Sequence, residues 1–253
     1  MRPLIFSLLV LAIQSISESS YAAVFSRLDI WNKSKIEVCF YNPINSTFYH
    51  PTKKSKKLDG SAAILVRPTE ELKLFSKQIL QQNYSREETI IEFVGWKDCD
   101  VTTKYDVILV FSDEPLGSGE SNMYSDFDRM HLNYLTTTIG LGTVNAENLS
   151  LTPEMKHVLI HEFGHLAGLG HEHEFFIKSA LSDPQCEHLY EYLQSFKKYE
   201  EAMWDLFPEY KRYKTKRKSI TGYDSNSVMT YCKKSDQLSE FDKITLRYMY
   251  RKH

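Results

Sequence analysis

One stretch of this chain points to both its fold and its chemistry, and it reads His161-Glu162-Phe163-Gly164-His165-Leu166-Ala167-Gly168-Leu169-Gly170-His171. His161 and His165 are four residues apart, so on a helix they lie one turn apart on the same face. Both rings can then direct a nitrogen at one metal ion, at the roughly 2.0–2.1 Å typical of zinc. The spacing therefore predicts a helix that carries two metal ligands.

Glu162 and His171 complete the predicted centre. The Glu162 carboxylate follows the first ligand, where it can accept a proton from a metal-activated water and return it to a leaving amine. His171 can reach the same metal only if the helix ends and the backbone reverses, and Gly168 permits the left-handed conformation that this needs. Three His ligands leave a position for water, whereas structural zinc sites usually close with four protein ligands and favour Cys. The stretch therefore indicates a catalytic zinc site rather than a structural one or a metal-free His-rich helix.

The residues before His161 predict the helix independently of the ligands. Thr152 is a good N-cap, Pro153 fits the first helical position, and Glu154 suits the positive end of the helix dipole. An apolar stripe follows at helical spacing, formed by Met155, Val158, Leu159, Phe163 and Leu166. We expect one helix over residues 153–167 that ends at Gly168.

A second stretch, residues 222–231, reads Gly-Tyr-Asp-Ser-Asn-Ser-Val-Met-Thr-Tyr and begins about fifty residues beyond the first. Together the two stretches resemble the metzincin zinc peptidases, whose signature is H-E-x-x-H-x-x-G-x-x-H followed by a Met in a turn. The Ser-Val-Met-x-Tyr pattern is similar to the Met-turn of the astacin branch. The resemblance implies that Met229 forms an apolar floor beneath the zinc ion. It also implies that Tyr231 is a switching fifth ligand whose hydroxyl stabilises the oxyanion. Without the zinc motif, both would be read as ordinary packed residues.

Near the third histidine and in the Met-turn, the chain matches the astacin pattern at one further position and departs from it at others. Glu172 follows the third His, as in astacins, where this Glu anchors the processed N-terminus or a neighbouring turn; a solvated surface acid is the alternative. Thr230 stands where astacins usually have His, and Leu-Gly-His-Glu-His follows Gly168 in place of the common Phe-x-His-Glu. His173 and Glu174 extend the cluster, but the spacing does not require them as ligands. The chain thus resembles a divergent, astacin-like metzincin.

The resemblance implies an α+β fold with a catalytic domain over residues 23–253. Its upper lobe, residues 23–168, would contain a twisted five-stranded mixed sheet and two helices. Its smaller lower lobe, residues 169–253, would be mostly irregular and helical, with the Met-turn and a C-terminal helix. About 230 residues remain after removal of a signal peptide, which suits one compact unit.

Patterns along the chain agree with this order of elements. Alternation predicts strands over residues 36–41 and 89–96, and a continuous apolar run predicts a buried strand over residues 105–112. Helical periodicity or composition predicts helices over residues 69–82 and 185–206.

Two further elements are expected around the site. By resemblance, residues 117–133 supply an edge strand near residues 119–124 and the strand behind it. Such an edge could bind an extended peptide as an additional strand. A last helix opens at Leu238 and should pack under the site through Ile244, Leu246, Tyr248 and Met249.

The first residues predict export. Arg2 precedes an apolar run over residues 4–13, and Ser20-Tyr21-Ala22-Ala23 follows, which is typical of a signal peptide over residues 1–22. The run is too short to span a bilayer, so we expect no stable membrane insertion. The expected location is extracellular, or periplasmic in a Gram-negative source. Only about eight residues separate the cleavage site from Trp31, so we infer export without a substantial inhibitory propeptide; control would come from a protein inhibitor or from expression.

Four cysteines fit an oxidising compartment, and three pairings of them are possible. We favour Cys39 with Cys99, because each lies at an end of a predicted strand. We favour Cys186 with Cys232, which would tie the segment after the zinc ligands to the Met-turn. The chain contains no C-x-x-C, so a role for these thiols in zinc binding or catalysis is disfavoured.

The formal net charge of −2 gives no reason to expect nucleic acid or an anionic membrane as a partner. The resemblance therefore predicts a secreted, monomeric zinc endopeptidase that acts on a protein or peptide. An inactive metzincin scaffold that binds a partner is one alternative, although such scaffolds tend to lose the Glu or a ligand and this chain keeps them all. A zinc amidase for a non-protein amide is another, and it would use the same residues.

Overall fold

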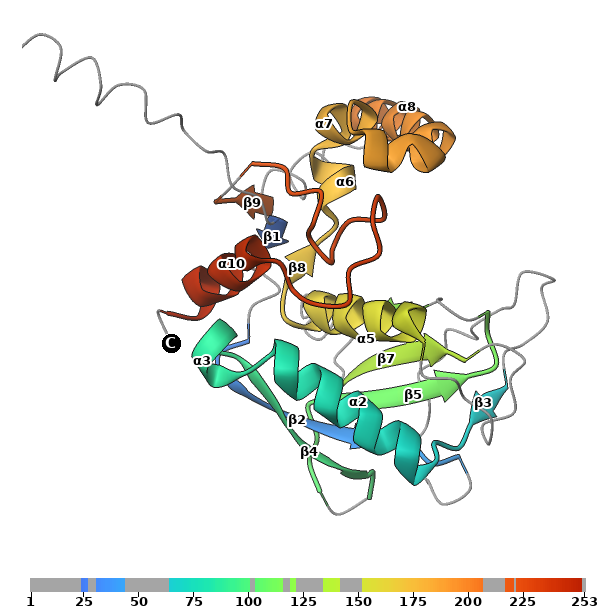
Figure 1. Ribbon diagram of the computed structural model, residues 1–253, viewed down its shortest axis with the longest axis vertical. Coiled ribbons are helices and arrows are strands. Elements are labelled where there is room, and N and C mark those ends of the chain that lie inside the picture. The colour runs from blue at the N-terminus through green and yellow to red at the C-terminus, as the bar shows by residue number, and fades with distance from the viewer. Residues whose placement is uncertain are drawn as a thin grey trace, which may run out of the picture.

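The computed structural model describes residues 24–26, 31–43, 64–100, 103–115, 119–121, 134–141, 152–206, 217–220 and 222–251. Within these residues the chain has an α+β fold, in which two helices cover one face of a mixed sheet (Figure 1). The predicted signal peptide, residues 1–22, lies outside the described residues. Among the residues described, no helix is long and apolar enough to cross a membrane.

The main sheet has the strand order β4-β2-β5-β7-β6. Four strands run parallel: β2 (Lys35–Phe40), β4 (Glu92–Asp98), β5 (Val107–Ser112) and β7 (Leu135–Gly140). The edge strand β6 (Gly119–Ser121) pairs antiparallel with β7, and the two-residue β3 (Leu65–Val66) pairs antiparallel with β5. Every residue of β5 and β7 is buried, as expected for central strands of a largely parallel sheet. The predicted five-stranded mixed sheet is confirmed, with β3 as a short addition.

Two boundaries differ from prediction. The strand behind the edge was expected within residues 117–133, but it is β7, whose Thr-rich, β-branched sequence favours a strand; residues 122–133 lie outside the described part. The strand predicted from residue 89 begins only at Glu92. A one-turn helix, α3 (Arg86–Thr89), occupies the preceding residues because the Ser85 side chain accepts a hydrogen bond from Glu88 N.

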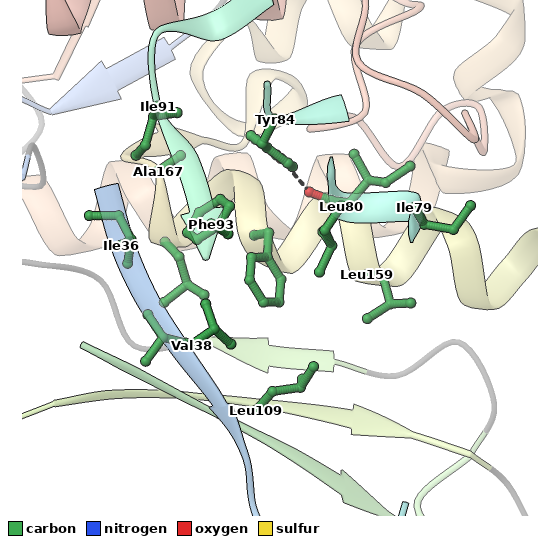
Figure 2. Close-up of a cluster of buried hydrophobic side chains, with 14 of the residues drawn as sticks. Ile36, Val38, Ile79, Leu80, Tyr84, Ile91, Phe93, Leu109, Leu159 and Ala167 are labelled. Carbon is green, nitrogen blue, oxygen red and sulfur yellow. Dashed lines mark hydrogen bonds between the residues drawn. The ribbon is translucent and has the colours of Figure 1, made fainter. Parts of the chain in front are cut away.

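The two helices on the sheet begin where their capping residues predict. In α2 (Glu70–Asn83) the Thr69 side chain accepts a hydrogen bond from Leu72 N, and in α5 (Pro153–Leu166) the Thr152 side chain accepts one from Met155 N. Between them and the sheet lies the main core, seen in Figure 2, where residues of β2, β4 and β5 meet Leu80 and Leu159. Burial of these apolar faces fixes α5 against the sheet.

Three hydrogen bonds from distant aromatic side chains also hold α5. Tyr84 donates to Ile160 O at 2.6 Å, shown as the dashed line in Figure 2. The Trp31 indole donates to Leu166 O at 2.7 Å, and the Tyr250 hydroxyl donates to Ala167 O at 3.0 Å. The last two satisfy carbonyls that the end of a helix leaves without intrahelical partners. The C-terminal end of α5 is therefore held by Trp31, near the start of the described chain, and by Tyr250, near its end.

The chain after α5 is mainly helical. It forms α6 (Glu172–Phe175), α7 (Ile177–Leu181), α8 (Tyr190–Leu206) and α10 (Glu240–Tyr250). The single helix predicted over residues 185–206 is divided, because a 3₁₀ segment, η2 (Pro184–Leu189), begins at Asp183, whose side chain accepts from Gln185 N. In α10, Leu246 and Met249 are buried as predicted. Ile244 and Tyr248 are 38% and 43% exposed, so the prediction that they pack under the site was wrong.

A small second sheet was not predicted. It has the order β8-β1-β9, in which β1 (Val24–Ser26) pairs antiparallel with both β8 (Leu169–Gly170) and β9 (Arg217–Ser219). Strands of two or three residues carry no readable periodicity. Both favoured disulfides, Cys39–Cys99 and Cys186–Cys232, are confirmed.

Candidate metal centre

Three imidazoles converge at the C-terminal half of α5. His161 and His165 project from consecutive turns of the helix, and His171 follows β8. The Nε2 atom of His171 lies 3.1 Å from that of His161 and 3.0 Å from that of His165. One ligand nitrogen from each residue lies within 4.8 Å of the others, so this group could hold a metal ion. The structure thus brings together the three residues that the sequence predicted as ligands.

The contacts of the Nδ1 atoms of His161 and His165 determine the tautomers of these two rings. His161 Nδ1 lies 2.8 Å from Val228 O, and His165 Nδ1 lies 2.9 Å from Leu169 O. A carbonyl oxygen can only accept, so each Nδ1 carries the proton and each Nε2 presents a lone pair. These two contacts orient the rings for metal binding.

The geometry and charge of the group fit a cation. The pKa of His161 is lowered well below its ordinary value. Burial is the largest cause, and the neighbouring His165 and His171 lower the pKa further. A neutral imidazole is the form that ligates metals. Nitrogens around one tetrahedral zinc ion would lie about 3.3 Å apart, close to the Nε2 spacings observed here. An imidazole donor set suits zinc and also other first-row metals, so the donors support a metal site more firmly than the identity of its ion.

The backbone reversal predicted at Gly168 delivers the third ligand. Gly168 has a φ of 93° and its N–H donates to His165 O at 2.9 Å. This left-handed conformation ends the helix and directs the chain into β8. Pairing of Val24 with Gly170 then holds the residue that precedes His171.

Glu162 lies against the edge strand of the sheet. Its side chain is buried, and a Cβ built at Gly119 of β6 would lie 2.6 Å from Glu162 Oε1. Ser121, at the other end of β6, donates to Glu162 O at 3.1 Å. The carboxylate therefore lies at the strand that was expected to bind an extended peptide.

The Met-turn, residues 222–231, lies against α5 and the His161 ring. Met229 is fully buried, and its sulfur packs where Gly164 of α5 has no side chain. Asp242 of α10 holds the turn, because its carboxylate accepts from Ser227 Oγ at 2.6 Å and from Val228 N at 3.1 Å. Val228 in turn provides the carbonyl that orients His161. The turn therefore supports the candidate ligand group through His161 and Gly164.

Tyr231 reaches the cluster from the end of the Met-turn. Its hydroxyl lies 3.1 Å from His171 Nε2, and its ring centroid lies 5.4 Å from that of His161. Tyr231 is 40% exposed. The structure thus brings Tyr231 next to the three residues that the sequence predicted as ligands.

Two residues after His171 contribute more than the sequence indicated. Glu172 is fully buried and accepts from Asp224 N at 2.8 Å, so the surface-acid alternative was wrong and the residue anchors a neighbouring turn. His173 is also fully buried and accepts from Tyr231 N. The only signal for His173 was the departure from the astacin pattern, because its contact with Tyr231 joins residues far apart in sequence.

No protein-family model matches the sequence, and no curated protein matches it. Two solved structures of myroilysin resemble the chain. The first has a TM-score of 0.49 and 17% identity, covering 90% of this chain and 98% of that chain. The second has a TM-score of 0.47 and 15% identity, covering 88% of this chain and 86% of that chain. With scores this low, a function has to be argued from the residues of the site.

Proposed function

We propose that the chain is a secreted zinc endopeptidase of the astacin-like metzincin type, with a catalytic domain over residues 23–253 divided into lobes at Gly168. One observation carries the proposal: three imidazole nitrogens, two of them with fixed lone pairs, converge beside the Tyr231 hydroxyl, and the buried Glu162 directly follows the first of these histidines on the same helix. Two confirmed disulfides support an oxidising compartment.

The residues have distinct tasks in this proposal. Zinc held by His161, His165 and His171 would polarise the scissile carbonyl and acidify a bound water. Glu162 accepts the proton that the attacking water loses and passes it to the leaving amine, so that a C–O bond forms as the C–N bond breaks. The Tyr231 hydroxyl donates a hydrogen bond to the oxygen on which negative charge develops.

The edge strand β6 supports a peptide as substrate. It pairs with β7 on one side only within the described residues, and it lies directly beside Glu162. An extended peptide that added to its other side would place a backbone carbonyl near the general base. A peptide that binds in this way is recognised through its main chain, so side-chain preference would depend on other contacts.

The first prediction tests the base. Glu162→Gln should keep one zinc ion per chain and lower kcat about 10²–10⁴-fold, because an amide cannot accept the proton. Peptide-library digestion followed by mass spectrometry measures the cleavage, and zinc analysis of the same sample measures the metal. Glu187→Gln, an exposed residue of η2, is the matched control and should cleave like the wild type. Full activity of Glu162→Gln would refute the mechanism.

The same digest separates the alternatives. A zinc endopeptidase cleaves peptides within the chain, loses this activity with a chelator, and regains it with zinc. An inactive binding scaffold would retain zinc and cleave nothing. A zinc amidase would leave the peptide library intact but release amine from a non-peptide amide. The intact Glu162 and the β6 edge beside it favour the endopeptidase.

A further inference from the structure

His173 lies within the site but outside the ligand group. It is the second residue of α6 and is fully buried. The candidate ligand group among the described residues consists of His161, His165 and His171. The burial of His173 therefore calls for another explanation.

The contacts of His173 connect it to Tyr231. Tyr231 N donates to His173 Nδ1 at 3.3 Å, so Nδ1 is the acceptor and the ring proton lies on Nε2. The two ring centroids lie 4.4 Å apart with an interplanar angle of 34°. The His173 ring centroid also lies 5.1 Å from that of His171 and 6.1 Å from that of Tyr192. One side chain thus contacts both the backbone and the ring of Tyr231.

The Tyr231 ring also contacts two of the candidate ligands, with centroid distances of 4.9 Å to His171 and 5.4 Å to His161, so His173 adds a contact from outside the ligand group. The Tyr231 side chain is 40% exposed and extends from the last residue of the Met-turn. Glu172, the residue before His173, makes two hydrogen bonds with earlier residues of the Met-turn. Its N–H donates to Met229 O at 3.3 Å, and its Oε2 accepts from Asp224 N at 2.8 Å. His173 extends this attachment to the residue whose hydroxyl faces the ligand nitrogens.

We propose that His173 is a positioning residue that holds Tyr231 in the orientation needed for its hydroxyl to stabilise the oxyanion. The proposal rests on the zinc peptidase function proposed above. His173 acts chiefly through its acceptor nitrogen, which fixes the Tyr231 backbone, while its ring only packs against the phenol. A small displacement of a catalytic hydroxyl costs rate, because the hydrogen bond must meet charge where it develops.

Two variants separate the acceptor from the ring. His173→Asn retains an oxygen where Nδ1 lies, whereas His173→Phe retains a ring without an acceptor. We expect His173→Phe to lower kcat about tenfold with KM unchanged within twofold, and His173→Asn to recover most of the loss. His188→Phe, at an exposed position of η2, is the matched control and should behave like the wild type. Equal losses in both His173 variants would overturn the proposal.

A double-mutant cycle tests whether His173 acts through Tyr231. In a Tyr231→Phe background, where the hydroxyl is already absent, His173→Phe should lower kcat by less than twofold. The same tenfold loss in that background would mean a general structural role and would overturn the proposal. Zinc content and thermal stability of each variant establish that the comparison is between folded, metal-loaded proteins.

A spectroscopic measurement is independent of cleavage. Copper(II) in place of zinc should show a tyrosine-to-copper charge-transfer absorption in the wild type, because the Tyr231 hydroxyl lies 3.1 Å from a ligand nitrogen. Tyr231→Phe should abolish this band, and His173→Phe should weaken or shift it while His173→Asn and His188→Phe retain it. An identical band in His173→Phe would overturn the positioning role. If no protein cleaves any peptide but the band responds as expected, the peptidase proposal fails and the His173 contact stands.

Discussion

Gly164 lies between the two candidate ligands of α5, and its missing side chain decides how closely the Met-turn approaches them. A Cβ there would overlap the Met229 sulfur, and Met229 is fully buried. The adjacent Val228 carbonyl orients His161, so displacement of the turn would also disturb a ligand. The glycine is therefore part of the support of the metal centre.

Gly164→Ala should lower the free energy of unfolding by about 1–3 kcal/mol, because an added methyl group overpacks a filled core. It should also weaken zinc binding, measured by competition with a chelator. In a Met229→Ala background the added methyl group has room, so the stability cost of Gly164→Ala should shrink. Denaturant unfolding of the four proteins measures this coupling. Additive effects would show that Gly164 and Met229 are not in conflict.

Among the elements, the two disulfides have different relations to the site. Cys39–Cys99 joins the ends of β2 and β4, whereas Cys186–Cys232 joins η2 to the residue after Tyr231. Their sequence separations of 60 and 46 residues are similar. Chain-entropy estimates therefore assign each about 4 kcal/mol of stabilisation. Only the second borders a proposed catalytic residue.

Replacing each pair by serines should separate stability from activity. Both double variants should lose a comparable amount of unfolding free energy, up to about 4 kcal/mol. The Cys186/Cys232 variant should also have a lower kcat, because Tyr231 is then less firmly held. The Cys39/Cys99 variant should have the kcat of the wild type once the value is corrected for its folded fraction. Active-site titration with a tight inhibitor corrects for the folded fraction. Equal turnover in the two variants would contradict this distinction.

For the molecule as a whole, a group of buried acids beneath the metal centre couples stability to pH. Asp242, Glu172 and Asp224 are all buried, and they connect α10 and α6 to the Met-turn. Burial raises the pKa of Asp242 from 3.8 to about 6, although hydrogen bonds from Ser227, Ser239 and Val228 oppose the rise. The pKa of Glu172 is also raised well above its ordinary value. Burial is the largest cause, and the negative charge of Asp242 is the second.

Because the folded state binds the Asp242 proton more tightly than the unfolded state, this group stabilises the fold most below about pH 4. The contribution is lost as the pH rises through about 6, and it amounts to about 3 kcal/mol. Asp242→Asn removes this titration. Between pH 4 and 7, therefore, the metal-free wild type should lose about 2 kcal/mol more unfolding free energy than the metal-free variant. Parallel pH curves would refute this assignment.

The sequence by itself determined the local features of this protein. Four-residue spacing places His161 and His165 on one face of a helix, Thr152 caps that helix, and Gly168 ends it, because each feature depends only on neighbouring residues. The apolar run that becomes β5 was readable for the same reason. Element types and the ligand spacing therefore followed from local pattern.

Only the tertiary structure decided what depends on contacts between distant residues. It placed β7 rather than residues 117–133 behind the edge strand, and it paired β1 with β8. It also buried His173 against Tyr231, 58 positions along the chain. Strand pairing and buried hydrogen bonds join groups without regard to sequence spacing, so periodicity cannot reveal them. The candidate ligands were therefore predictable from the sequence, whereas the contacts that orient them required the fold.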